Sequence, residues 1–238
     1  MTKISRSKID LFVECPRCFW LDLRQGVKRP SFPPYTINNA VDYLLKQEFD
    51  VHREKGTPHP VMKEHGIAAV PFQHPNMNKW RHNFTGVQYH HEPTDFMVFG
   101  AVDDIWVDSK GRLMIVDYKA TGANEHRIYD SYQRQMEIYQ WLVSKNGFEV
   151  LPTGYFLFAR VNKSEGFGLP SVVRQPVDEE GGRKAVLPFD LFLESYEGNR
   201  SWIDETLKEA RSVYDVSKAP AASVNCEYCS FAVKQGRF

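Results

Sequence analysis

Two Cys-x-x-Cys pairs near opposite ends of this 238-residue chain restrict its fold more than any other feature. The first pair is Cys15 and Cys18, and the second is Cys226 and Cys229. In a reducing compartment such pairs are typical of metal ligands rather than of disulfides. If all four thiolates bind one metal centre, the two ends of the chain must meet, and the metal then restricts the unfolded chain. The alternative is two sets of buried free thiols.

The composition indicates one globular domain spanning residues 1–238. The chain is 42% hydrophobic, which is enough for one sizeable core. Its 30 basic and 30 acidic residues give zero net charge, so a nucleic acid partner must be held by a local patch. The chain has no apolar run long enough for a membrane span and no apolar signal core at its start. We therefore expect a cytoplasmic protein without a membrane partner.

Apolar periodicity and turn residues predict alternating helices and strands. Pro16 should interrupt a first helix that begins near Ser5 or Ser7, and Gly111 suits the left-handed position of a hairpin loop. The later elements are expected as a helix around 40–49, strands at 96–102 and 113–116, a helix at 129–145, a strand at 154–159, a polar excursion at 162–184 and a long helix at 189–215. This order predicts an α/β fold with a central mixed sheet flanked by helices.

The expected hairpin brings acidic and basic side chains together. Asp117 and Lys119 are two residues apart on a strand, so both side chains leave the same face. If the hairpin turns on residues 109–111, its register places Asp103 opposite Asp117. Asp104 then points to the other face. Two carboxylates and one ammonium group are thus expected on one patch.

This arrangement indicates a divalent metal site. Two close carboxylates repel each other unless a cation lies between them, and oxygen ligands suit Mg²⁺ or Mn²⁺. The backbone carbonyl of Tyr118 is a candidate further ligand, and Lys119 is placed to orient a water molecule or to stabilise a transition state. The expected chemistry is attack of water on a phosphodiester. The alternative is an ordinary solvated strand face, because Asp-x-Lys is a short motif.

Three motifs resemble those of the PD-(D/E)XK nuclease superfamily, and specifically of its RecB-like branch. Residues 100–103 (Gly-Ala-Val-Asp) look like the family's Gly-x-hydrophobic-Asp element, and residues 117–119 (Asp-Tyr-Lys) look like its Asp/Glu-x-Lys element. Residues 135–139 look like its Gln-x-x-x-Tyr element. The resemblance implies a restriction-endonuclease-like core at about residues 36–160, with cysteine-site segments at about 5–30 and 219–238.

In this family Gln135 and Tyr139 would lie beside the metal and help to place DNA. Their spacing agrees, because residues four apart share one face of a helix. The alternative is that Tyr139 is a core residue and Gln135 a boundary residue.

One position departs from the family pattern. RecB-like nucleases usually carry a metal-binding histidine on an early helix, where this chain has Asp42. An aspartate can bind a hard cation, and Glu48 is a second candidate for the same role. The departure keeps a second hypothesis open: a catalytically inactive DNA-binding or scaffold subunit that retains the nuclease fold.

The metal at the four cysteines has two candidate identities. Tetrahedral four-cysteine sites suit zinc or an iron–sulfur cluster, and the two-and-two spacing indicates zinc. The resemblance favours a [4Fe–4S] cluster, because CRISPR-associated exonucleases and AddB-type subunits carry one, usually with one early cysteine and three late ones. A zinc-binding interaction protein with an incidental acidic patch is a third hypothesis for the whole chain.

The resemblance implies a Mg²⁺- or Mn²⁺-dependent deoxyribonuclease, with exonuclease character on single strands or DNA ends, in repair, recombination or defence. A helicase or another DNA-processing protein is the expected protein partner. Tyr35, Trp80 and Trp20 are candidate stacking surfaces for single-stranded DNA. The basic residues of the N-terminal segment are candidate phosphate contacts; they are Arg6, Lys8, Arg17, Arg24, Lys28 and Arg29.

Overall fold

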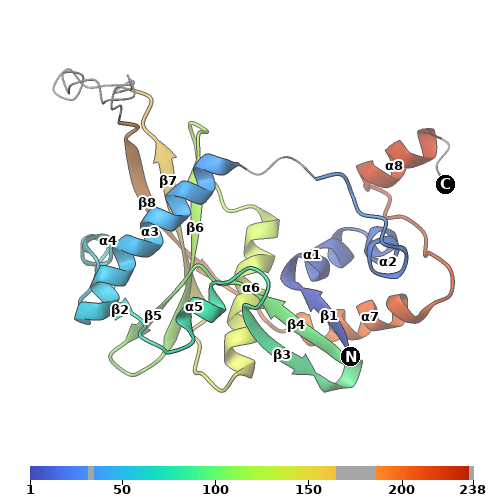
Figure 1. The fold of residues 1–238 in the computed structure, drawn as a ribbon, viewed down its shortest axis with the longest axis horizontal. Helices are drawn as coiled ribbons and strands as arrows, with labels where there is room; N and C mark the ends of the chain where they lie inside the picture. The colour runs from blue at the N-terminus through green and yellow to red at the C-terminus, as the bar shows by residue number, and fades with distance from the viewer. Residues whose placement is uncertain (32–34, 165–185, 236–238) are drawn as a thin grey trace, which may run out of the picture.

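A five-stranded mixed sheet forms the centre of the molecule (Figure 1). The computed structural model describes residues 1–31, 35–164 and 186–235. The strand order is β2 (Ala69–Pro71), β5 (Asp104–Asp108), β6 (Leu113–Thr121), β7 (Thr153–Val161) and β8 (Phe189–Glu197). Strands β6 and β7 are parallel and the other neighbours are antiparallel, so the central sheet is mixed, as expected.

Helices cover both faces of this sheet. Helix α3 (Thr36–Lys55) crosses one face, where Val41, Leu45 and Phe49 recur at helical spacing and pack into a core beneath the helix. Helix α6 (Asp130–Lys145) lies on the other face and also contacts β3 and β4. It therefore lies between the central sheet and a second, three-stranded sheet (Figure 1).

The second sheet places the first residues of the chain beside β4. Its order is β1 (Thr2–Ser5), β4 (Phe96–Gly100) and β3 (Val87–His91), with β1 parallel to β4. The remaining helices are α1 (Arg6–Glu14), α2 (Pro16–Gln25), α4 (Pro60–Glu64), α5 (Met77–Trp80), the 3-10 turn η1 (Glu92–Thr94), α7 (Ile203–Asp215) and α8 (Glu227–Lys234). Within the described ranges, every helix is too short or too polar to cross a membrane.

The expected hairpin exists, but its first strand is later in the chain than predicted. The segment 96–102 yields β4, which belongs to the second sheet, and the strand paired with β6 is β5. The turn has the expected form, because Gly111 has a φ of +81°. The prediction was wrong because both 96–100 and 104–108 are apolar enough to be strands, and only tertiary packing assigns their partners.

The expected long helix at 189–215 was also wrong. Residues 189–197 form β8, which pairs with β7 along its whole length, and a helix begins only at Ile203. Aromatic and branched side chains favour the strand, and Gly198 follows its last residue. Most of the expected polar excursion at 162–184 lies outside the described residues.

Candidate active site

The β5–β6 hairpin presents Asp103 beside Asp117. Asp104 pairs with Val116, so Asp103 precedes β5 by one residue in the predicted register. The backbone N–H of Tyr118 donates to Asp103 Oδ2 at 3.0 Å and fixes that carboxylate at the open end of the hairpin. The carbonyl of a strand residue leaves on the same side as its N–H, so the Tyr118 carbonyl faces this end as well.

Asp117 is fully buried, and its two oxygens have different surroundings. Oδ1 accepts a hydrogen bond of 2.7 Å from Gln135 Nε2. Oδ2 forms an ion pair with the ammonium group of Lys119. Burial raises the pKa of Asp117 to about 6; Lys119 opposes this rise and the charge of Asp103 adds to it.

Helix α6 supports Asp117 and Lys119 from one side. Gln135 Nε2 also contacts the Tyr139 hydroxyl at 3.1 Å, and Lys119 Nζ donates to Gln135 Oε1 at 3.3 Å. Tyr139 packs against Gly100, where an added Cβ would lie 2.6 Å from the tyrosine ring. The glycine of the first motif therefore makes room for the tyrosine of the third.

Helix α3 contributes Asp42 together with a lysine that sequence reasoning missed. Lys46 Nζ donates to Asp42 Oδ2 at 2.8 Å and to Asp103 Oδ1 at 3.3 Å, so it links the two carboxylates. The available signal was the spacing of four residues between Asp42 and Lys46. Glu48 is not brought to this group: its carboxylate contacts His59 Nε2 at 2.9 Å and is about half exposed.

The donor set fits a hard divalent cation. Three carboxylates, from Asp42, Asp103 and Asp117, lie close together: Lys46 pairs with the first two and Lys119 with the third. Burial and the charge of Asp103 raise the pKa of Asp42, with Lys46 opposing. Such mutual repulsion is relieved by a cation bound through oxygen ligands.

Except for the fully buried Asp117, these groups line a cleft with two lobes that share Asp103 and Asn83. One lobe, of about 400 Å³, includes Asp42, Lys46 and Lys119. The other, of about 300 Å³, includes Gln135 and Tyr139 together with residues 5–7 of the N-terminal segment. The cleft therefore runs along the open end of the hairpin, with Asp103 at its middle.

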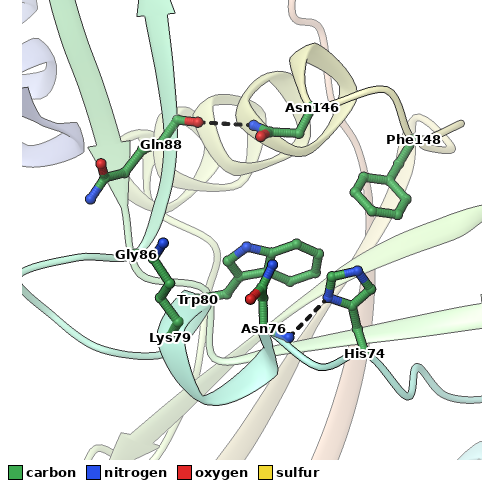
Figure 2. Close-up of a pocket in the computed structure, with 8 residues that line it drawn as sticks. All are labelled: His74, Asn76, Lys79, Trp80, Gly86, Gln88, Asn146 and Phe148. Atoms are coloured by element: carbon green, nitrogen blue, oxygen red, sulfur yellow. Dashed lines mark hydrogen bonds between the residues drawn. The ribbon is translucent and has the colours of Figure 1, made fainter.

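A separate hollow of about 310 Å³ lies beside α5 and contains none of these groups (Figure 2). His74 stacks on the Trp80 ring with centroids 4.3 Å apart, and Phe148 meets that ring edge-on. Trp80 is thus buried, as is Trp20, whose indole N–H donates to the Val216 carbonyl. Neither tryptophan offers the open stacking surface that the sequence suggested, whereas Tyr35 is exposed.

The four cysteines meet where α2 and α8 come together (Figure 1). Their sulfur atoms all lie within 4.8 Å of one another. The Cys18 sulfur lies 3.6 Å from that of Cys226 and 3.5 Å from that of Cys229. These distances exceed the ~2.05 Å of a disulfide, and all four thiols are free and buried. The structure thus brings both pairs into one possible metal site.

The four thiols differ in how readily they ionise, because burial raises the pKa of Cys18 and of Cys229. Burial opposes ionisation of Cys15, but the backbone N–H groups of Ser223 and Cys18 lower its pKa to about 6. The guanidinium of Arg29 donates to Cys226 Sγ at 3.6 Å. A thiolate is the form that binds metals, and a nearby cation stabilises it.

Comparison with known proteins agrees with these motifs. The family model of the PD-(D/E)XK nuclease superfamily matches residues 34–233. Among solved structures, the crystal structure of SSO0001 is similar at 12% sequence identity and a TM-score of 0.44, over 98% of this chain and 85% of that one. No curated protein matches the chain.

Proposed function

Because the chain belongs to the PD-(D/E)XK nuclease superfamily, whose members are typically metal-dependent nucleases, we propose that it hydrolyses phosphodiester bonds in DNA. The observation that carries the proposal is the convergence of Asp103, Asp117 and Lys119 at the open end of the hairpin, where Asp103 and Lys119 line the cleft and the buried Asp117 is paired with Lys119. Asp103, Asp117, Asp42 and the Tyr118 carbonyl are the proposed ligands of Mg²⁺ or Mn²⁺.

Each residue then has a physical task. A bound divalent cation supplies positive charge at the phosphoryl oxygens and lowers the pKa of water. Lys119 holds a second positive charge beside Asp117, where charge develops on the phosphate during attack. Gln135 positions the Asp117 carboxylate and the Lys119 ammonium group through its two amide atoms, and Tyr139 in turn contacts Gln135.

We propose the RecB-like branch and exonuclease activity on single strands or DNA ends, in repair, recombination or defence, with a helicase or other DNA-processing protein as partner. The motif resemblance supports these finer assignments. The two-lobed cleft is consistent with a strand that passes Asp103.

The test is a cleavage assay with Mn²⁺ or Mg²⁺ on end-labelled single- and double-stranded DNA. Asp117→Ala or Lys119→Ala should abolish metal-dependent cleavage, whereas Glu48→Gln, which changes a carboxylate outside the cleft, should not. Products shortened from one end support the exonuclease assignment, and internal cuts contradict it. Tight DNA binding by the wild-type protein without any cleavage would favour the inactive scaffold that the replacement of histidine by Asp42 suggested.

We also propose that the four cysteines bind a metal that ties the two ends of the chain together. The family resemblance supports a [4Fe–4S] cluster, whereas the close spacing of the four sulfur atoms, all within 4.8 Å of one another, suits a single tetrahedral zinc ion. Anaerobic purification decides between them: absorption near ~400 nm with iron and sulfide supports the cluster. Stoichiometric zinc without that band supports zinc, and zinc in a protein without nuclease activity supports the interaction-protein hypothesis.

A further inference from the structure

The cleft extends beyond the proposed catalytic residues to the start of the chain. Ser5, Arg6 and Ser7 line the lobe that also contains Gly100 and Tyr139. The catalytic roles proposed above use none of these three N-terminal residues. Their position in the same cleft as Asp103 makes them candidates for contact with the substrate outside the reacting bond.

Backbone pairing determines where Arg6 lies. Strand β1 is parallel to β4 and places Ser5 opposite Phe99. Helix α1 begins at the next residue, Arg6, which therefore lies beside Gly100. Gly100 is three residues before Asp103 in the chain. The location of Arg6 near the metal site is therefore a consequence of the second sheet.

The charge of Arg6 has no carboxylate partner among the described residues. Asp10, four residues later on the same helix, is bound by Arg134 instead. Burial lowers the pKa of Arg6, but the Tyr139 hydroxyl, Asp10 and Asp117 outweigh that effect and raise it. Arg6 is thus a half-buried permanent cation that lines the cleft without an ion pair.

The first turn of α1 adds donors to the same wall. The Ser5 side chain makes no capping bond to the helix and shares a hydrogen bond of 2.8 Å with the Ser7 hydroxyl. The first N–H groups of a helix have no partners within the helix, and an anion is favoured there. Arg6 lies beside these groups in the lining of the cleft.

We propose that Arg6, with Ser7 and the first turn of α1, binds a backbone phosphate of the DNA strand next to the phosphate that is hydrolysed. The inference rests on the proposed function, because it takes the cleft to hold a DNA strand. Arginine suits this task, since its planar guanidinium binds two phosphate oxygens at once. The cleft then engages at least two consecutive phosphates, one at the metal site and one at Arg6.

The first experiment measures binding of a labelled single-stranded oligonucleotide in EDTA at several salt concentrations. One lost phosphate contact should lower the slope of log affinity against log salt by about 0.7. We expect this for Arg6→Gln, with about tenfold weaker binding, and a retained slope for Arg6→Lys. Lys208→Gln is the matched control, because this exposed lysine of α7 lines neither lobe.

The second experiment changes the substrate instead of the protein. A neutral methylphosphonate linkage beside the cleaved bond should raise the KM of the wild-type protein about tenfold with little change in kcat. Arg6→Gln should show that same rise on ordinary DNA and no further rise on the modified strand. The wild-type measurement is informative even if Arg6→Gln does not fold.

The outcomes separate the two proposals. An unchanged salt slope in Arg6→Gln, or wild-type cleavage insensitive to the neutral linkage at either neighbouring position, overturns the Arg6 proposal while the nuclease stands. A lowered slope in a protein that cleaves nothing supports the Arg6 contact while the nuclease proposal fails. A wild-type protein that binds no strand in EDTA overturns the Arg6 proposal, whereas the cleavage assay with Mn²⁺ or Mg²⁺ decides the nuclease proposal.

Discussion

Two charged clusters lie on opposite faces of the β5–β6 hairpin. One contains Asp103 and the other contains the next residue, Asp104. Asp104 faces away from the cleft, where Arg53, Arg81 and the Tyr118 hydroxyl all bind its carboxylate. Arg53 and Arg81 also share Asp50, so two carboxylates match two guanidinium groups. Asp103 faces the cleft, where Asp42 and Asp117 lie near it, two lysines pair with the three carboxylates, and Arg6 lines the other lobe.

The difference separates a structural cluster from a chemical one. The Asp104 cluster is neutral, and rigid arginine forks bind its carboxylates. The cleft cluster places three carboxylates close together, and burial raises the pKa of two of them, Asp42 and Asp117. The two are linked, because Arg81 Nε also donates to the Asp103 backbone carbonyl at 3.0 Å. Through this hydrogen bond the Asp104 cluster holds the backbone at Asp103, which carries a carboxylate of the cleft cluster.

The sharpest test of this comparison is Asp117→Asn. We expect cleavage to fall by about 10³-fold, because the substitution removes charge from the metal site but retains a polar group of the same size. Initial rates with Mn²⁺ measure the effect. Activity within a few-fold of the wild-type value would show that the cleft cluster is not the chemical one.

Asp104→Asn should damage the fold. It leaves two buried guanidinium groups short of one negative charge, and removing one partner of a buried ion pair costs about 3–5 kcal/mol. Urea denaturation monitored by tryptophan fluorescence measures the loss in the free energy of unfolding. A loss comparable to that of Asp108→Asn, at the tip of the same hairpin, would contradict the structural role.

Asp42 and Glu48 test which acidic residue of α3 serves the cleft. Asp42→Asn should weaken divalent metal binding by about 10–100-fold, a range typical for residues that support a metal site. Glu48→Gln should leave binding unchanged, since its carboxylate lies outside the cleft and contacts His59. Calorimetric titration with Mn²⁺ measures both, and the reverse ranking would assign the site to Glu48.

The pH dependence of metal binding should follow Asp117. Because the pKa of Asp117 is raised to about 6 in the folded protein, the metal-free fold is more stable when this acid is protonated. This contribution to the free energy of unfolding is present at low pH and is lost as pH rises through about 6. Metal requires the carboxylate, so each unit below about pH 6 should lower affinity up to about tenfold. The rise in Tm on adding Mn²⁺ should be larger at about pH 7.5 than at about pH 5. Asp117→Asn should lose this difference, and a wild-type response independent of pH would contradict it.

Local periodicity was sufficient for much of the candidate site. The two-residue repeat of a strand put Asp117 and Lys119 on one face and separated Asp103 from Asp104. The helical repeat placed Gln135 and Tyr139 in contact. Glu48 was the second candidate for the early-helix ligand, and the structure places it outside the cleft, because six residues after Asp42 correspond to about 240° of helix rotation beyond one whole turn. The paired spacing of the cysteines predicted that the two ends of the chain meet.

Tertiary structure decided what periodicity leaves open. Residues 96–100 and 104–108 are both good strands, and only packing against β1 and β6 gave each its partner. Helix α3 brought Lys46 between Asp42 and Asp103, and β1 brought Arg6 to the other lobe of the cleft. A sequence pattern reports which face of an element a side chain occupies. Contacts between residues distant in the chain depend instead on how whole elements bury their apolar faces together, and that requires the entire fold.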